Sequence, residues 1–131
     1  MISTAVYYIL ANDATVASKV SNRIYPNKAV QSSAMPYIIY SVVSKVPTDS
    51  KDNGTGFDRN RVQIDIVDDS YTNNELLASY VRTALDGKKG VYGGTTILQS
   101  IYDNEVDVNA NFTEDSEQIY HKAVDFIIIT K

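Results

Sequence analysis

Hydrophobic and polar residues alternate from Arg61 to Ile66 in the segment RVQIDIV, residues 61–67. Val62, Ile64 and Ile66 are separated by single polar or charged residues. A repeat of two is typical of a strand with one buried and one exposed face, and such strands usually belong to antiparallel sheets. The segment therefore predicts a half-buried antiparallel strand.

The pattern changes directly after this strand, in TNNELLASYVRTALDG. Here apolar residues recur at intervals of three and four, which is the repeat of an amphipathic helix. Thr72 and Glu75 have the spacing of a capping box, and Gly87 stands where a left-handed residue often ends a helix. We expect a helix over about residues 72–86 whose apolar stripe is formed by Leu76, Leu77, Tyr80, Val81, Ala84 and Leu85.

The first 25 residues predict a broken helix. Ser3 can cap a short helix, and Asp13 can cap a second turn that carries Val16 and Val20. Proline disfavours helix at the residue before it, so Tyr25-Pro26 ends this region.

Three more segments have the β-branched and aromatic composition of strands. They are PYIIYSVVSKV, TILQSIYD and YHKAVDFIIIT. The first is apolar enough to predict burial on both faces over part of its length. The segment KKGVYGG, with Gly90, Gly93 and Gly94, predicts a turn.

These elements predict a single α+β domain over residues 1–131. A mostly antiparallel sheet of about four strands would pack against the broken N-terminal helix and the helix at 72–86. Long polar loops are expected at about 47–60 and 104–118.

Composition narrows the possible functions. The 131 residues include 12 basic and 16 acidic side chains, a net charge of −4, which lacks the positive surface that grips a phosphate backbone. Without cysteine, disulfides and thiolate-bound metals are excluded. The apolar runs are far shorter than the roughly 18 residues that span a bilayer, and the first residues do not form a signal peptide. We expect a soluble intracellular protein with no membrane partner.

Candidate catalytic chemistry is sparse. His121 is the one histidine, and a lone histidine in a strand is more often structural than catalytic. The other possible centre of an enzymatic or ligand-binding site is a set of three carboxylates, those of Asp65, Asp68 and Asp69. The sequence predicts no enzyme activity and no cofactor.

One segment partly matches a calcium-binding loop. In DNEVDVNANFTE, oxygen-bearing side chains occupy the ligand positions of the template, but Val108 replaces its central glycine and the flanks have strand composition. No metal site is therefore predicted. The matching side chains are Asp103, Glu105, Asp107, Asn109, Asn111 and Glu114.

The order and spacing of the segments resemble a known family. NRIYP precedes MPYIIYSVV, and a polar loop, RVQIDIVDDSY, VRTALDG, ILQSIYD and DFIII follow. From about Ala11 to Ile129 the chain resembles the tail completion proteins of long-tailed bacteriophages, also called tail terminator or tail-to-head joining proteins. Relatives often carry an aromatic residue where this chain has the isoleucines of DFIII.

The resemblance implies a structural virion protein rather than an enzyme. Its copies would form a ring, by expectation hexameric, at the head-proximal end of the tail after assembly in the host cytoplasm. The ring would terminate the tail tube, join it to the head connector or stopper protein, and leave a channel through which DNA passes without specific binding. Ten tyrosines suit such interfaces, because tyrosine is large and amphipathic.

Within this interpretation the two polar loops are candidate contacts. The segment TDSKDNGTGFDRN, residues 48–60, is expected to order against a neighbouring subunit. Its candidate interface residues are Lys51, Asp52, Phe57, Asp58 and Arg59. The second loop is expected to face the channel and repel DNA through Glu105, Asp107, Glu114, Asp115 and Glu117.

Three alternatives stay open at this point. A head-side connector or stopper protein would also form rings. A small ligand-binding or enzymatic α+β domain would use His121 and the aspartates of the second strand. A nucleic-acid-binding protein would show salt-sensitive affinity for DNA, against which the net charge argues.

Overall fold

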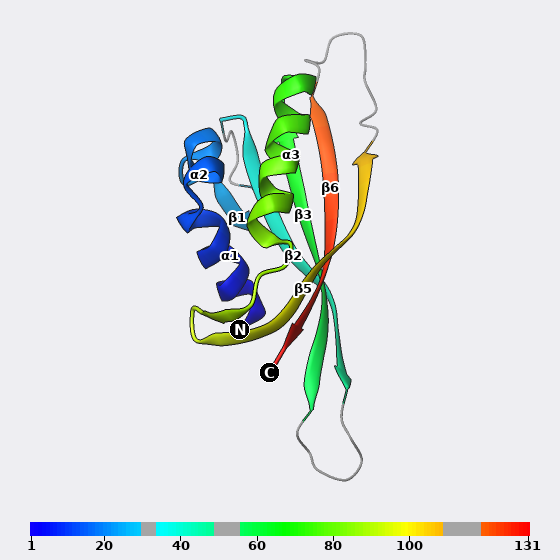
Figure 1. Ribbon diagram of the computed structural model, residues 1–131. Helices are drawn as coiled ribbons and strands as arrows, with labels where there is room; N and C mark the ends of the chain where they lie inside the picture. The colour runs from blue at the N-terminus through cyan, green and yellow to red at the C-terminus, as the bar shows by residue number, and fades with distance from the viewer. Residues whose placement is uncertain (30–33, 49–55, 109–118) are drawn as a thin grey trace.

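The computed structural model describes residues 1–29, 34–48, 56–108 and 119–131. Three helices lie on one face of a strongly twisted sheet, and the other face of the sheet carries no helix of the described residues (Figure 1). The elements in chain order are α1 (Ile2–Asn12), α2 (Ala14–Val20), β1 (Ile24–Pro26), β2 (Tyr37–Thr48), β3 (Phe57–Asp68), α3 (Tyr71–Leu85), β4 (Gly90–Tyr92), β5 (Thr95–Val108) and β6 (Tyr120–Thr130).

The sheet has six strands in the order β1-β2-β3-β6-β5-β4. β1 pairs parallel with β2, and every other pair is antiparallel. The predicted α+β class and mostly antiparallel sheet are confirmed, whereas the prediction of about four strands is wrong. The two additional strands, β1 and β4, have three residues each, which is too short for a hydrophobic repeat to reveal them.

The helix ends agree with the sequence prediction in part. Asp13 caps α2, because its Oδ1 accepts hydrogen bonds from the N–H groups of Thr15 (3.1 Å) and Val16 (3.0 Å). α3 begins before the predicted capping box: Ser70 is its cap and accepts from the N–H of Asn73 at 3.3 Å. Gly87, with φ +77°, follows α3 in the left-handed conformation that was predicted.

The core fills the space between the helices and one face of the sheet. Val62, Ile64 and Ile66 of β3 are fully buried there, as their alternation predicts. Asp65 and Val67, on the opposite face, are also buried, so β3 is half-buried only over its first part. Phe126 of β6 is the largest fully buried side chain. β2 follows the same one-sided pattern, so the prediction that it is buried on both faces is wrong: the helices cover a single face of the sheet, and only alternate residues of β2 reach the core.

Two hairpins extend from opposite ends of the molecule (Figure 1). β2 and β3 stay paired as far as Thr48 and Phe57, and β5 and β6 as far as Val108 and His121. The loops are therefore shorter than the predicted ranges 47–60 and 104–118. Residues at both ends of the first range, and residues 104–108 of the second, belong to paired strands. Residues 49–55 and 109–118 lie outside the described residues.

No helix within the described ranges is long and apolar enough to cross a membrane.

Candidate interaction surfaces

Three of the five predicted interface residues lie where the first hairpin leaves the body. Phe57, Asp58 and Arg59 begin β3, and the Phe57 side chain is 41% exposed although it is aromatic. Asp58 forms an exposed ion pair with Lys45 of β2, with 3.5 Å between Nζ and Oδ2. The two other predicted residues, Lys51 and Asp52, lie outside the described residues. The structure thus places the three described candidates on a strand rather than in a loop.

The acidic residues predicted to face a channel are divided in the same way. Glu105 and Asp107 belong to β5 and form ion pairs with Lys122 of β6, at 3.3 Å and 2.8 Å. Glu75 of α3 is a third carboxylate partner of this lysine. The remaining predicted residues, Glu114, Asp115 and Glu117, lie outside the described residues.

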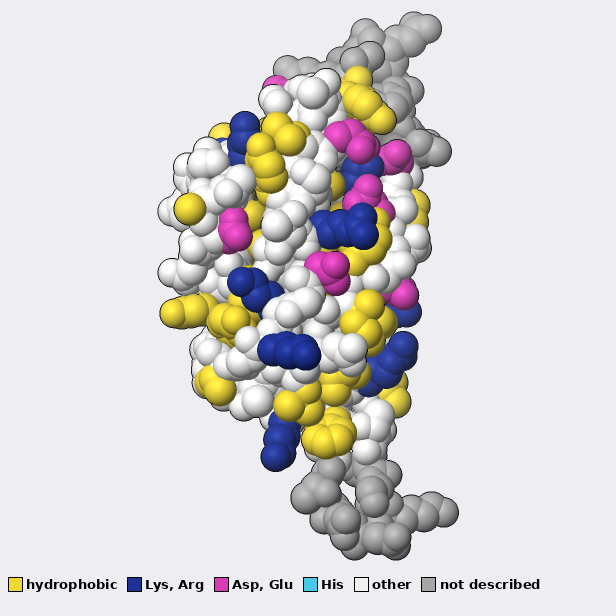
Figure 2. Space-filling model, viewed as in Figure 1, with side chains coloured by type: hydrophobic (Ala, Val, Ile, Leu, Met, Phe, Trp, Pro, Cys, Tyr) yellow, Lys and Arg dark blue, Asp and Glu magenta, His cyan; other side chains and the backbone are white. Residues whose placement is uncertain are grey.

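Lys122 is nearly buried, with 3% of its surface exposed. Burial alone would lower the pKa of its ammonium group, but hydrogen bonds to the three carboxylates outweigh this effect and raise the pKa above its usual value. Figure 2 shows acidic side chains gathered near the upper ends of α3 and β5. With three carboxylates around one ammonium group, this cluster keeps a surplus of negative charge.

The helix-free face of the sheet carries a second charged group. Arg61 of β3 forms ion pairs with Asp103 of β5 at 2.8 Å and with Asp125 of β6 at 3.6 Å. Burial raises the pKa of the Asp125 carboxyl, and the Arg61 guanidinium partly offsets this shift. The three side chains connect β3, β6 and β5 across the centre of that face.

The structure brings together only two of the rival catalytic residues, His121 and Asp65. His121 Nε2 lies 3.0 Å from Asp65 Oδ1, and Gln63 donates a hydrogen bond to the same carboxylate at 2.9 Å. Asp68 is three residues farther along the same strand, so its side chain points to the opposite face. Burial and a hydrogen bond with Asp69 raise the pKa of the Asp68 carboxyl. The predicted carboxylate group is therefore split between the two faces of the sheet.

The calcium template is not realised as a helix-flanked loop, because Asp103–Val108 lies in β5. Across the described ranges, no group of three or more His, Cys, Asp or Glu side chains is arranged to hold a metal ion.

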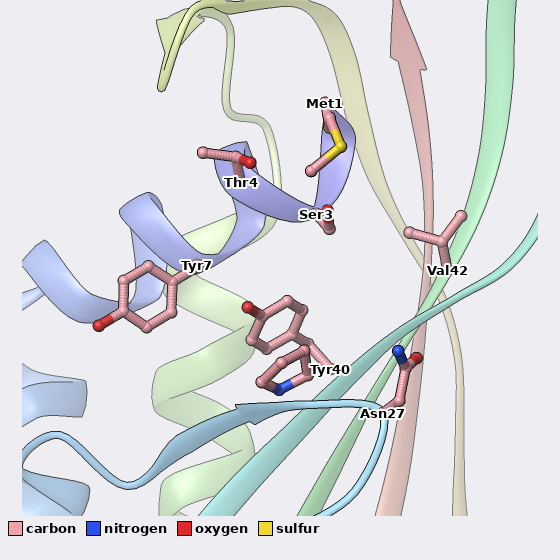
Figure 3. Close-up of a pocket in the computed structure, with 8 residues that line it drawn as sticks. Met1, Ser3, Thr4, Tyr7, Asn27, Tyr40 and Val42 are labelled. Atoms are coloured by element: carbon pink, nitrogen blue, oxygen red, sulfur yellow. The ribbon is translucent and has the colours of Figure 1, made fainter.

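A hollow that the sequence pattern does not predict lies between α1 and the β1–β2 edge of the sheet. It has a volume of about 540 Å³. Figure 3 shows the ring of Tyr7, from α1, beside that of Tyr40, from β2, with ring centroids 6.2 Å apart. Burial, followed by the effect of Tyr7, raises the pKa of Tyr40. The further lining residues are Met1, Ser3, Thr4, Pro26, Asn27 and Val42.

The two long hairpins also carry a set of exposed valines that the sequence pattern does not predict. Val43 and Val46 of β2 are 54% and 52% exposed, and Val106 and Val108 of β5 are 50% and 39% exposed. The sequence shows that these segments have strand composition, but it does not show that they lie at the borders of the sheet. Exposed apolar side chains at strand edges are typical of surfaces that bind another chain.

The fold corresponds to that of a solved virion component. The chain superimposes on a chain from a structure described as the virion of a native gene transfer agent particle, with a TM-score of 0.75 and 18% sequence identity. The match covers 96% of this chain and 91% of the other chain. A search of curated protein sequences finds no significant match.

The family follows from the sequence. The model of the family described as tail completion protein gp17 matches residues 4–131. The chain belongs to the tail completion protein gp17 family. This result confirms the resemblance seen in the segment order, and it implies a structural role in a bacteriophage virion rather than catalysis.

Proposed function

We propose that copies of this chain form a ring, by expectation a hexamer, that terminates the tail tube of a phage-type particle. The observation that carries the proposal is the family match over nearly the whole chain. The structural match to a chain of a virion supports it, because virion components act through assembly with other proteins.

The shape of the subunit supports assembly as its mechanism. A closed ring of identical subunits needs two different patches on each subunit, one for each neighbour. The β2–β3 and β5–β6 hairpins leave the body at opposite ends (Figure 1). Each hairpin carries apolar side chains that remain exposed in the single chain. The β2–β3 hairpin, with Phe57 at its described end, is the proposed arm that contacts a neighbouring subunit or the tube.

The ring would join the tail to the head connector and leave a channel for DNA. It would lie at the head-proximal end of the tail, after assembly in the host cytoplasm. The acidic residues at 114, 115 and 117 stay a prediction for the channel wall, where negative charge would repel DNA and let it slide.

A test of this function is mixing the purified chain with purified tail tubes and, separately, with capsids that carry a portal. Native mass and negative-stain images report whether a ring forms and where it binds. We expect a ring at one end of the tubes and no binding to capsids. Binding to capsids alone would instead assign the chain to the head side, as a connector or stopper protein. A chain that stays monomeric and ignores both partners would contradict the proposal.

A further inference from the structure

Both borders of the sheet are covered by short strands that leave most of the neighbouring strand open. β1 pairs with β2 only at Ile38–Tyr40, and β4 pairs with β5 only at Thr95–Ile97. Beyond these points, no strand of the described residues pairs with the outer side of β2 over 42–48 or with the outer side of β5 over 103–108. We call these two stretches the β2 edge and the β5 edge.

The backbone of both edges can accept another strand. The last outer contact on β5 is the Tyr102 N–H, which donates a hydrogen bond to Asp86 Oδ1 at 3.0 Å. Unpaired N–H and C=O groups along a strand edge are a template for pairing with a further chain. Pro47 has no N–H to donate, so the useful part of the β2 edge is 42–46.

The side chains of the two edges are complementary. On the helix-covered face, Lys45 of the β2 edge has its side chain 53% exposed, and its one ion pair, to Asp58, is long at 3.5 Å. On the same face of the β5 edge, Glu105 and Asp107 share Lys122 with a third carboxylate, and the Asp107 side chain is still 62% exposed. An exposed, weakly paired cation on one edge therefore matches surplus negative charge on the other.

On the helix-free face, both edges present exposed apolar side chains. Val46 of the β2 edge and Val106 of the β5 edge are each about half exposed. Val43 and Val108 extend these two apolar surfaces. Pairs of β-branched residues opposite each other stabilise antiparallel strands.

We infer that the β2 edge of one copy pairs antiparallel with the β5 edge of the next copy, with Lys45 opposite Asp107 and Val46 opposite Val106. This inference rests on the proposed ring and names the surfaces that close it. We call this paired contact between two copies the seam. It places Glu105 and Asp107 between subunits, whereas the sequence suggested that they face the channel.

The strand directions agree with a ring. β2, β3, β6 and β5 are joined by three antiparallel pairings, so β2 and β5 run in opposite directions. Rotation about a ring axis brings the β5 edge of each copy beside the β2 edge of the next, and every seam is then antiparallel. Each copy uses both edges once, which leaves no edge open when the ring closes.

The pairing also requires a stagger between neighbouring copies. Through the registers of β3 and β6, Lys45 is level with Ser100 of the same copy, whereas its proposed partner is Asp107 of the next. A shift along the strand direction between successive units is what a closed sheet of tilted strands needs.

The absence of cysteine makes the seam directly testable by cross-linking. In the double variant Val46→Cys/Val106→Cys, oxidation of the assembled protein should convert the monomer band on a non-reducing denaturing gel into a ladder that ends at the ring number. Each single variant should stay almost entirely monomeric. The matched control is Val46→Cys/Val91→Cys, because Val91 lies on β4 and is 67% exposed, and this pair should give no ladder.

Native mass of the oxidised samples tests the ring and the strand pairing at its seam separately. A ring by mass without a ladder from Val46→Cys/Val106→Cys would overturn the seam and leave the proposed ring intact. Absence of a ring for the unchanged chain, with and without tail tubes, would overturn the proposed function and the seam together.

Changes of charge test the lysine contact. Lys45→Glu should reduce the fraction of protein in rings, because like charges directly opposite each other destabilise paired strands. The reciprocal removal of charge, Asp107→Asn, should lower that fraction as well, while Lys89→Glu, an exposed control on the turn before β4, should leave it unchanged. A ring fraction for Lys45→Glu equal to that of the unchanged chain would count against the seam.

Discussion

Replacement of Lys122 by methionine tests how the charged cluster at the ends of β5, β6 and α3 contributes to folding. Methionine keeps the apolar stem of lysine but removes the ammonium group, which pairs with Glu75, Glu105 and Asp107. Loss of one partner from a buried ion pair typically costs about 3–5 kcal/mol, because the other charge is left without compensation. The change therefore leaves three carboxylates close together without a cation.

The cost should fall at the lower end of that range. The side chains of the three carboxylates keep 40%, 27% and 62% of their surface exposed, so water can replace part of the lost interaction. We expect a loss of about 3 kcal/mol in the free energy of unfolding. For a domain of this size that corresponds to a fall in Tm of about 10 °C.

Urea and thermal unfolding at dilute protein concentration measure this effect. Lys45→Met is the matched control, because its lysine has a 53% exposed side chain and a single long ion pair. Such an exposed pair is worth about 0.5 kcal/mol or less, so the control should unfold close to the unchanged chain. A loss below about 1 kcal/mol for Lys122→Met would contradict a stabilising role of the cluster, since it would mean that the three ion pairs contribute no more than one surface pair.

The pH dependence adds a second check on Lys122. The folded protein holds the pKa of this lysine above its usual value of 10.5, so its stabilising contribution is complete below that value and is lost as the pH rises through the raised pKa. The difference in unfolding free energy between the unchanged chain and Lys122→Met should therefore shrink in strongly alkaline solution. A difference that stays constant there would contradict the proposed ionic role.

Three further predictions concern single side chains. Asp68→Asn should raise the free energy of unfolding at pH 7: the folded-state pKa of this buried carboxyl is raised above its usual 3.8, so the stability of the unchanged chain falls as the pH rises from 3.8 through the raised pKa. Urea unfolding across that pH range should show that the unfolding free energies of the two proteins become equal at the acid end. Equal unfolding free energies at pH 7 would count against this effect of Asp68. Asn60→Ala should cost about 2 kcal/mol in urea unfolding, because the buried Nδ2 donates to the Ile128 carbonyl at 2.9 Å and to Thr130 Oγ1 at 3.1 Å; a cost below about 0.5 kcal/mol would show that these bonds are replaced. Phe57→Ser should change monomer stability by less than about 0.5 kcal/mol, as exposed positions usually do, but should weaken tail binding in a co-sedimentation assay; unchanged binding would remove Phe57 from the interface.

The elements with a long hydrophobic repeat could be predicted from the sequence, and the others could not. β3 and α3 are each long enough for the repeat to identify both the element and its buried face. β1 and β4 form only because Ile38–Tyr40 and Thr95–Ile97 offer partners from other parts of the chain. Short strands of this kind depend on tertiary pairing, which a local pattern does not contain.

The contacts of the candidate interaction surfaces could not be predicted from the sequence either. Glu105 and Asp107 looked like loop charges because their segment is acidic, but pairing of β5 with β6 extends the strand and brings them to Lys122. The contact between His121 and Asp65 likewise joins residues 56 positions apart. Such contacts follow from sheet order and register, which the sequence alone leaves undetermined.

We propose that this chain ends a phage tail as a ring. The most direct test of this proposal is imaging of purified tail tubes by negative stain or cryo-electron microscopy, with and without the purified chain. We expect a ring of this protein at one end of every tube, with a passage along its axis and no binding along the tube wall. Tubes that look the same in both samples, with the protein left monomeric in solution, would contradict it.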